Sequence, residues 1–216
     1  MSTHTVDWHG SFAVIITPFT RDGEIDEDGY RGVVDLVIEA GCHGLISAGS
    51  TGEFFLMTDD ERRHVFSIAV DQAAGRIPVL AGTSATRTED VVSLTRYAAE
   101  IGCDGAMVLP PIYIGLDERE TVEFYSRVAG ESGLPIMLYN SPLAVMTELP
   151  ARLVEQLADI DNVVAIKDSS LDMQQMSDLV RLCGDEIRVF VGTEDLLLPA
   201  VAMGAVGAVA MVPQVV

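Results

Sequence analysis

Short runs rich in Val, Ile, Leu and Ala recur along the chain, with longer amphipathic segments between them. Within each run the apolar residues are nearly continuous rather than alternating, which is typical of parallel strands buried on both faces. A new run begins roughly every 20–35 residues, about the size of one strand–helix unit. The pattern predicts eight strands, over Phe12–Phe19, Gly44–Gly49, Pro78–Thr83, Gly105–Pro111, Pro135–Asn140, Val163–Ser169, Ile187–Thr193 and Gly207–Met211.

The segments between these runs carry signals for the start and the end of helices. Thr58–Glu61 and Thr86–Glu89 have the form of a capping box, and Asp117–Glu120 is a weaker version of it. Three turns place one glycine after a helix and another just before a strand, as expected where the chain adopts left-handed dihedrals. These glycine pairs are Gly41 and Gly44, Gly102 and Gly105, and Gly204 and Gly207.

Eight strand–helix units leave two main architectures, a closed barrel or a doubly wound open sheet. The dinucleotide-binding pattern GxGxxG is missing after the first run, which reads Thr17-Pro18-Phe19-Thr20. Polar residues instead follow several different strands, as the active site of a barrel requires; they include Ser50, Thr51, Tyr113, Tyr139, Asn140, Lys167 and Thr193. We therefore predict an α/β fold, a single (β/α)₈ TIM barrel over residues 1–216.

The length of the chain changes this picture in one respect. Barrels of this kind typically have about 250 residues, whereas this sequence has 216 and ends just past the eighth predicted strand. We expect a fragment of a longer polypeptide, truncated after the eighth strand and lacking the final helices.

Composition and charge exclude several classes of function. The net charge of −20 disfavours nucleic acid, whose recognition needs clustered Lys and Arg. No apolar run is long enough to span a membrane, and the first residues do not form a secretory leader. The three cysteines form no CxxC pair, which favours a reducing, cytoplasmic location.

Lysine is the most informative residue type. Twelve of the 13 basic residues are Arg, and the single lysine, Lys167, ends the buried run Val163–Asp168. Burial lowers the pKa of an ammonium group, and the neutral amine that results can attack a carbonyl and form an imine. The alternative is a structural lysine paired with Asp168. Imine formation is favoured because Lys167 is the only lysine in the sequence and tyrosines lie on neighbouring strands.

Two tyrosines are candidates for proton transfer beside such an imine. Tyr139 ends the fifth predicted strand and Tyr113 the fourth, and a phenol can act as a general acid or base. Each could equally be a packing residue with its hydroxyl at the rim. The loop Gly49–Glu53 offers hydroxyls and backbone amides suited to a carboxylate. Because the four histidines lack metal-binding spacing, no metal and no cofactor is expected.

Taken together, these motifs resemble the dihydrodipicolinate synthase / N-acetylneuraminate lyase family of Schiff-base-forming aldolases. The matching segments lie along essentially the whole chain: Thr17-Pro18-Phe19, Gly49-Ser-Thr-Gly-Glu53, Tyr139-Asn-Ser-Pro142, Ile166-Lys167-Asp168 and Gly204–Val209. The resemblance implies a small-molecule 2-oxo acid substrate and a homo-oligomer, a tetramer or a dimer.

The resemblance also implies roles for individual residues. Lys167 forms the imine, Tyr139 transfers protons, and Tyr113 resembles a relay tyrosine that the synthase branch borrows across a dimer interface. Ser50 and Thr51 hold the substrate carboxylate or join the relay, and Gly49 and Val209 complete the expected substrate-binding set.

One departure from the family pattern bears on the reaction. In the synthase branch an arginine lies five residues after the tyrosine and binds the carboxylate of the aldehyde partner, but here that position is Ala144. We therefore expect a lyase, either an aldolase or a dehydratase, acting on pyruvate or a keto-deoxy sugar acid. The alternatives are condensation of the 4-hydroxy-tetrahydrodipicolinate synthase type and a non-catalytic paralogue that binds sugar acids.

Overall fold

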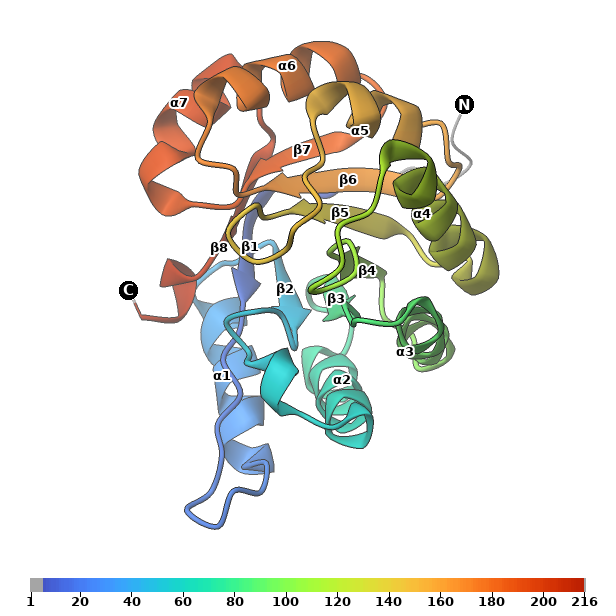
Figure 1. Cartoon of the computed structure of the whole chain (residues 1–216). Coiled ribbons are helices and arrows are strands. Elements are labelled where there is room, and N and C mark those ends of the chain that lie inside the picture. The colour runs from blue at the N-terminus through green and yellow to red at the C-terminus, as the bar shows by residue number, and fades with distance from the viewer. Residues whose placement is uncertain (1–5, 216) are drawn as a thin grey trace.

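Eight parallel strands close into a barrel in which neighbours along the chain are neighbours in the sheet, and β8 pairs back with β1 (Figure 1). The structure is a computed structural model that describes residues 6–215. The strands are β1 Gly10–Val14, β2 Gly44–Ser47, β3 Val79–Gly82, β4 Gly105–Val108, β5 Ile136–Asn140, β6 Val163–Asp168, β7 Arg188–Val191 and β8 Gly207–Ala210. The predicted barrel is thereby confirmed.

Helices follow the first seven strands and form a ring outside the barrel (Figure 1). They are α1 Glu27–Glu39, α2 Asp59–Ala73, α3 Thr88–Glu100, α4 Glu118–Ser132, α5 Ala151–Leu157, α6 Met173–Cys183 and α7 Leu197–Met203, with the 3₁₀ turns η1 Phe54–Leu56, η2 Glu194–Leu196 and η3 Val212–Gln214. Within residues 6–215, every helix is too short or too polar to cross a membrane.

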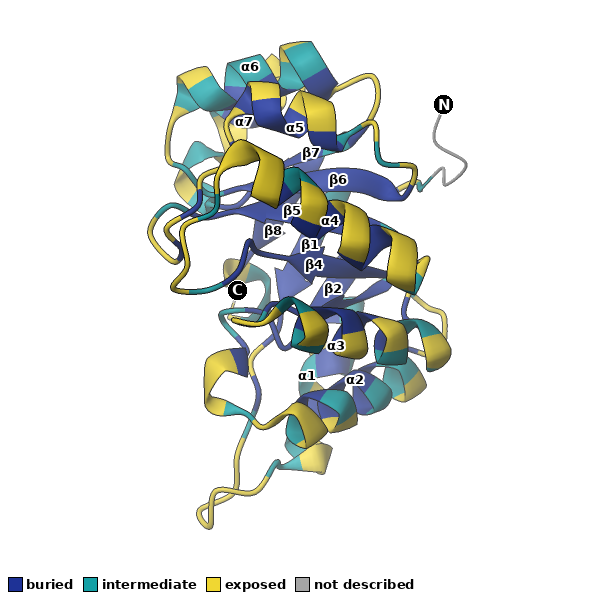
Figure 2. Ribbon diagram, turned by 45° about the vertical axis from the view of Figure 1, so that its right-hand side comes forward, coloured by how far each residue is buried: buried dark blue, intermediate teal, exposed yellow. Residues whose placement is uncertain are grey.

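Burial follows the sequence pattern from which the strands are predicted. The strands are buried along nearly their whole length, while each helix alternates between a buried and an exposed side (Figure 2). Leu45 and Ile46, neighbours on β2, are both fully buried, which is possible only because one faces the barrel interior and the other the helices. The core therefore fills both the barrel and the layer between barrel and helices.

Two of the three predicted capping boxes are present and one is not. Thr58 with Glu61 and Asp117 with Glu120 each form both reciprocal hydrogen bonds, at the starts of α2 and α4. The predicted box at Thr86 is wrong, because α3 begins at Thr88 and no side chain caps it. In a capping box the Glu89 carboxylate would accept the backbone amide of Thr86. It accepts a hydrogen bond from Arg127 at 3.0 Å instead.

The first and fourth strands are shorter than predicted. β1 ends at Val14, beyond which the backbone of Ile16 donates to the side chain of Gln214 at 2.8 Å. Pro18 then has no N–H to continue a ladder. β4 likewise ends at Val108, before two consecutive prolines, so Tyr113 lies in the loop after the strand and not at its end.

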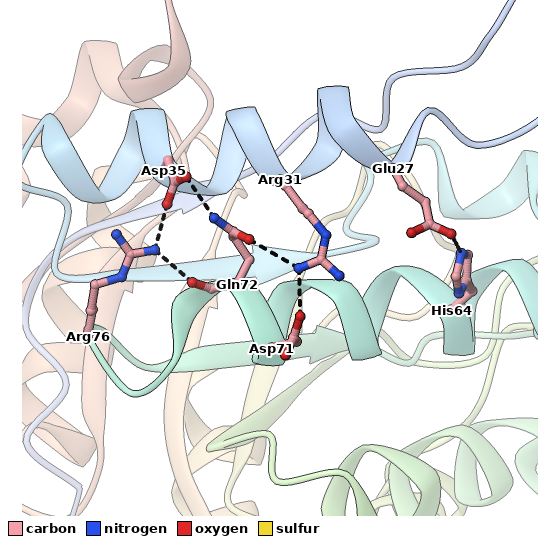
Figure 3. A network of polar contacts seen from close by, with 7 residues as sticks. All are labelled: Glu27, Arg31, Asp35, His64, Asp71, Gln72 and Arg76. Atoms are coloured by element: carbon pink, nitrogen blue, oxygen red, sulfur yellow. Dashed lines mark hydrogen bonds and ion pairs between the residues drawn. The ribbon is translucent and has the colours of Figure 1, made fainter.

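Polar contacts join α1 and α2 on the outside of the barrel (Figure 3). The shortest ion pairs, Arg31 with Asp71 and Arg76 with Asp35, have N–O distances of 2.6 Å. Pairs this exposed contribute about 0–1 kcal/mol each. This surface is therefore a solvated polar seam between α1 and the segment that contains α2.

Candidate active site

Two side chains from neighbouring strands, Lys167 on β6 and Tyr139 on β5, form the centre of the candidate site. The two residues are paired in the β5–β6 register, so their side chains leave the sheet on the same face. The Lys167 Nζ atom lies 4.3 Å from the centre of the Tyr139 ring. Only 5% of Lys167 and 7% of Tyr139 is exposed. The structure thus brings together the two residues predicted for imine formation and proton transfer.

The surroundings of Lys167 favour its neutral form. Burial lowers the pKa of the ammonium group below the ordinary lysine value, because the charged form loses its water. Tyr139 and Glu194 act in the opposite direction by stabilising the cation, but burial is the larger effect. The Glu194 carboxylate is held in place by the backbone amides of Met211 and Val212, at 2.5 and 3.0 Å.

The phenol of Tyr139 has a pKa below the usual value of a tyrosine. Burial alone would raise this pKa. The charge of Lys167 and the nearby hydroxyls of Ser141, Ser169 and Ser50 lower it, and their combined effect is larger than that of burial. While the nitrogen of Lys167 carries a positive charge, the phenol beside it can give up and take back a proton more readily than an ordinary tyrosine. Ser50, predicted as a site residue, therefore lies beside the group that we expect to move protons.

Two buried hydroxyl oxygens have no hydrogen-bond partner within residues 6–215, Ser169 Oγ and Thr193 Oγ1, and Ser169 lies beside this centre. Ser169 Oγ is thus close enough to Tyr139 to lower the pKa of the phenol, but the two side chains do not form a hydrogen bond of good geometry. Buried polar groups are nearly always bonded, so a hydroxyl left unpaired beside a reactive lysine is available to a ligand.

Gly192, the residue directly after β7, leaves room for both Ser169 and Lys167. A β-carbon at position 192 would lie 2.0 Å from Ser169 Oγ and 2.9 Å from Lys167 Cε. Neither Ser169 nor Gly192 is predicted as a site residue from the sequence. The one available signal is weak: Ser169 and Ser170 directly follow Lys167-Asp168.

The loop after β2, residues 49–53, presents the groups predicted to bind a carboxylate. At Gly49 a β-carbon would lie 2.4 Å from a methyl carbon of Val14, so a larger residue would push the loop away from β1. Ser50 and Thr51 are half-buried, and their backbone amides have no acceptor within the described residues. Free amides next to hydroxyls make a site suited to an anionic group.

Tyr113 and Val209 are the two remaining predicted site residues. Tyr113 is 84% exposed and has a φ of 74°, a left-handed conformation that is uncommon outside glycine. Val209 is fully buried on β8, paired with Phe12 of β1. Their roles in proton relay and substrate binding stay predictions. Within residues 6–215 no group of three His, Cys, Asp or Glu side chains could hold a metal ion.

Comparison with known proteins gives this site a context. Residues 7–216 match the model of the dihydrodipicolinate synthetase family. A 4-hydroxy-tetrahydrodipicolinate synthase of Methanothrix thermoacetophila is 39% identical over 209 residues, which are 96% of this chain and 70% of that protein.

Two crystal structures superpose closely. Dihydrodipicolinate synthase from Aquifex aeolicus has a TM-score of 0.93 and 35% identity, over 96% of this chain and 71% of its own. YagE, an E. coli K12 prophage protein in complex with pyruvate, has a TM-score of 0.94 and 31% identity, over 97% of this chain and 72% of its own. The resemblance seen in the sequence is confirmed, and the chain belongs to the dihydrodipicolinate synthetase family.

Proposed function

We propose that this enzyme is a Schiff-base-forming lyase that holds a 2-oxo acid, pyruvate in the simplest case, as an imine on Lys167. The observation that carries the proposal is the only lysine of the chain, buried at the carboxyl end of a barrel strand against Tyr139. Active sites of (β/α)₈ enzymes lie at this end of the barrel. The complex of YagE with pyruvate supports the choice of substrate class.

The chemistry follows from the neutral amine. The Lys167 nitrogen adds to the 2-oxo carbon, and loss of one water molecule gives a protonated imine. When a 4-hydroxy-2-oxo acid is bound, the 4-hydroxyl gives up its proton, the C3–C4 bond breaks and an aldehyde leaves. The electron pair of that bond moves to the imine nitrogen and leaves an enamine. Protonation at C3 and hydrolysis of the imine then release the 2-oxo acid and regenerate the amine.

Tyr139 is the group placed to move the proton in this sequence. Its lowered pKa allows the phenolate to take the proton of the 4-hydroxyl and the phenol to return a proton to C3. The free amides and hydroxyls of Ser50 and Thr51 would hold the carboxylate of the 2-oxo acid, which fixes the carbonyl carbon next to Lys167. A dehydratase would use the same imine but lose a proton from C3 and the hydroxyl from C4.

Condensation of the synthase type is the second candidate, favoured by the name of the Methanothrix relative. Against it, Ala144 occupies the position where the synthase branch is expected to carry an arginine. Its backbone amide closes a turn onto the Ser141 carbonyl at 2.9 Å, and the residue is exposed. A methyl group cannot bind the carboxylate of an aldehyde partner. Assays with pyruvate plus the synthase's aldehyde, and with 4-hydroxy-2-oxo acids alone, separate the two reactions.

We further propose a cytoplasmic homo-oligomer, a dimer or a tetramer. The loops that follow β4 and β5 carry exposed apolar residues, among them Tyr113 on the first loop and Leu143 and Met146 on the second, which are 84%, 86% and 72% exposed. Thr147 ties the two loops together by accepting a hydrogen bond from the Leu116 amide at 2.8 Å. An apolar group of this kind on a firm support fits a contact with a second copy. The three cysteines, all buried and free, fit a reducing compartment.

Borohydride reduction tests the proposed imine. Pyruvate plus borohydride should add one covalent adduct, and peptide mapping should place it on Lys167. Because the chain has no second lysine, the N-terminal amine is the one other primary amine that could react. Lys167→Arg should abolish the adduct, since a guanidinium stays protonated and cannot form the imine. An adduct that persists in this variant at an internal residue would exclude the proposal.

A further inference from the structure

A second pair of polar side chains lies directly behind Lys167 and Tyr139. Asn140 and Asp168 are the next residues along β5 and β6 and are paired in the same register. Because side chains alternate between the faces of a strand, this pair points away from the face that carries Lys167 and Tyr139. Asn140 Nδ2 donates a hydrogen bond to Asp168 Oδ1 at 2.6 Å, and the two residues are only 2% and 3% exposed.

The remaining oxygen atoms of this pair are also bonded. The Leu149 amide donates to Asn140 Oδ1 at 2.9 Å, and Ser170 Oγ donates to Asp168 Oδ2 at 2.6 Å. The backbone carbonyls of Asn140 and Asp168 each accept an amide from the following strand end, at 2.9 and 2.7 Å. Asn140 and Asp168 therefore join β5 to β6 through their side chains, and through their backbone carbonyls they bond the residues that directly follow β6 and β7.

A buried carboxylate is a costly way to join two strands. Burial raises the pKa of Asp168, and the nearby negative charge of Asp172 raises it too. Hydrogen bonds from Ser170 and Asn140 lower this pKa in part. For stability alone, apolar residues of similar volume often do as well as a buried charged group. What a hydrogen bond adds is direction, since it fixes one strand relative to the other within a fraction of an ångström.

We propose that Asn140 and Asp168 are positioning residues, whose cross-strand hydrogen bond sets the separation of Lys167 and Tyr139 on the other face of the same strands. This inference rests on the proposed function of Lys167. A displaced β5 end would carry Tyr139 with it and change both its influence on the Lys167 charge and its reach to the substrate. A misplacement of about 1 Å can lower a rate about 100-fold.

The single lysine makes the separation measurable without any substrate. Acetic anhydride acylates neutral amines, so the pH dependence of acylation at Lys167, followed by peptide mass spectrometry, reports the midpoint of its titration. The N-terminal amine serves as an internal standard. In Asn140→Ala this midpoint should move to lower pH, because Tyr139 no longer stabilises the Lys167 cation to the same extent. The rate of borohydride trapping with pyruvate should fall at least about tenfold.

Two further variants separate positioning from stability. Ser170→Ala removes the other side-chain hydrogen bond to the same carboxylate but leaves the link between β5 and β6. It should lower the melting temperature while the Lys167 midpoint and the trapping rate stay within about twofold of the wild type. The exchange of Asn140→Asp together with Asp168→Asn can retain all three side-chain hydrogen bonds, with donor and acceptor reversed between the strands. It should restore trapping to within about threefold.

The outcomes are distinct. A folded Asn140→Ala protein with wild-type midpoint and trapping rate would overturn the inference, as would equal shifts in Ser170→Ala. If Asn140→Ala does not fold, Asn140→Ser takes its place, because a serine hydroxyl is too short to hold both partners. If the wild type itself gives no adduct with pyruvate, the proposed function fails, whereas the acylation midpoints still decide whether the pair positions Lys167.

Discussion

The phenol oxygen of Tyr139 lies in a buried site where a lysine and three serine hydroxyls lower its pKa. Tyr139→Phe keeps the ring against Lys167 and removes only that oxygen. Because a general acid or base typically contributes about 10²–10⁴-fold, turnover should fall by that order. Imine trapping should persist, since the amine and the carboxylate-binding loop are unchanged. Single-turnover kinetics and trapping on the same variant test this. A loss below about tenfold would assign proton transfer to another group, with Tyr113 the first candidate.

Ser169 allows a sharper separation of function from stability. Its hydroxyl is buried and unpaired within the described residues, so Ser169→Ala removes no hydrogen bond of the protein. The melting temperature should stay unchanged or rise, while turnover should fall about tenfold or more because a substrate contact is lost. Ser170→Ala is the matched control, one residue away, where a bond to Asp168 is lost and the opposite pattern is expected. A destabilised Ser169→Ala enzyme with normal turnover would make Ser169 a packing residue.

Among single residues, the sequence predicts those whose role shows in their type and local position. A lone lysine at the end of an apolar run, and a tyrosine at the end of the preceding run, identify Lys167 and Tyr139. Ser169 and Gly192 are different, because their importance comes from a contact between the ends of β6 and β7. That contact depends on register and on the path of each strand, which the local sequence does not encode.

For the strands and helices, the sequence predicts their existence and order better than their first and last residues. All eight strands form, because continuous apolar runs flanked by turns have few other solutions in a barrel. Some ends differ because a side chain from a distant segment intervenes, as Gln214 does after β1 and Arg127 does at the start of α3. Such competition between local and distant partners cannot be read from a four-residue motif.

The end of β7 offers a test of how closely the strands meet. Gly192→Ala would place a β-carbon 2.0 Å from Ser169 Oγ and 2.9 Å from Lys167 Cε, so one of them must move. We expect pyruvate trapping on Lys167 to fall about tenfold or more. In the matched control, Gly130→Ala on α4, a β-carbon meets nothing within 4 Å. That change should add about 0.5–1 kcal/mol of stability and leave trapping unchanged. Normal trapping in Gly192→Ala would show that the strand ends are looser than the structure indicates.

On the scale of the whole molecule, closure of the barrel brings together groups from distant parts of the chain. Ser50 follows β2, whereas Tyr139 and Lys167 lie on β5 and β6, yet the serine lies close enough to lower the pKa of the phenol. The sequence anticipates this assembly because the carboxyl ends of parallel strands meet at one face. It cannot indicate whether Tyr113, exposed on its loop, belongs to the site of its own barrel or to that of a second copy.

Mixing two inactive variants answers that question. Tyr113→Phe keeps Lys167, and Lys167→Arg keeps Tyr113. If Tyr113 serves a neighbouring subunit, a hybrid dimer contains one site with both wild-type residues and one with neither. Random mixing through reversible dissociation should then restore about a quarter of the wild-type turnover for a two-fold symmetric dimer. If Tyr113 serves its own barrel, every site in the mixture carries one defect, and turnover stays at the level of the separate variants. A Tyr113→Phe enzyme as active as the wild type would instead remove Tyr113 from the reaction and leave its exposed ring as a contact residue alone.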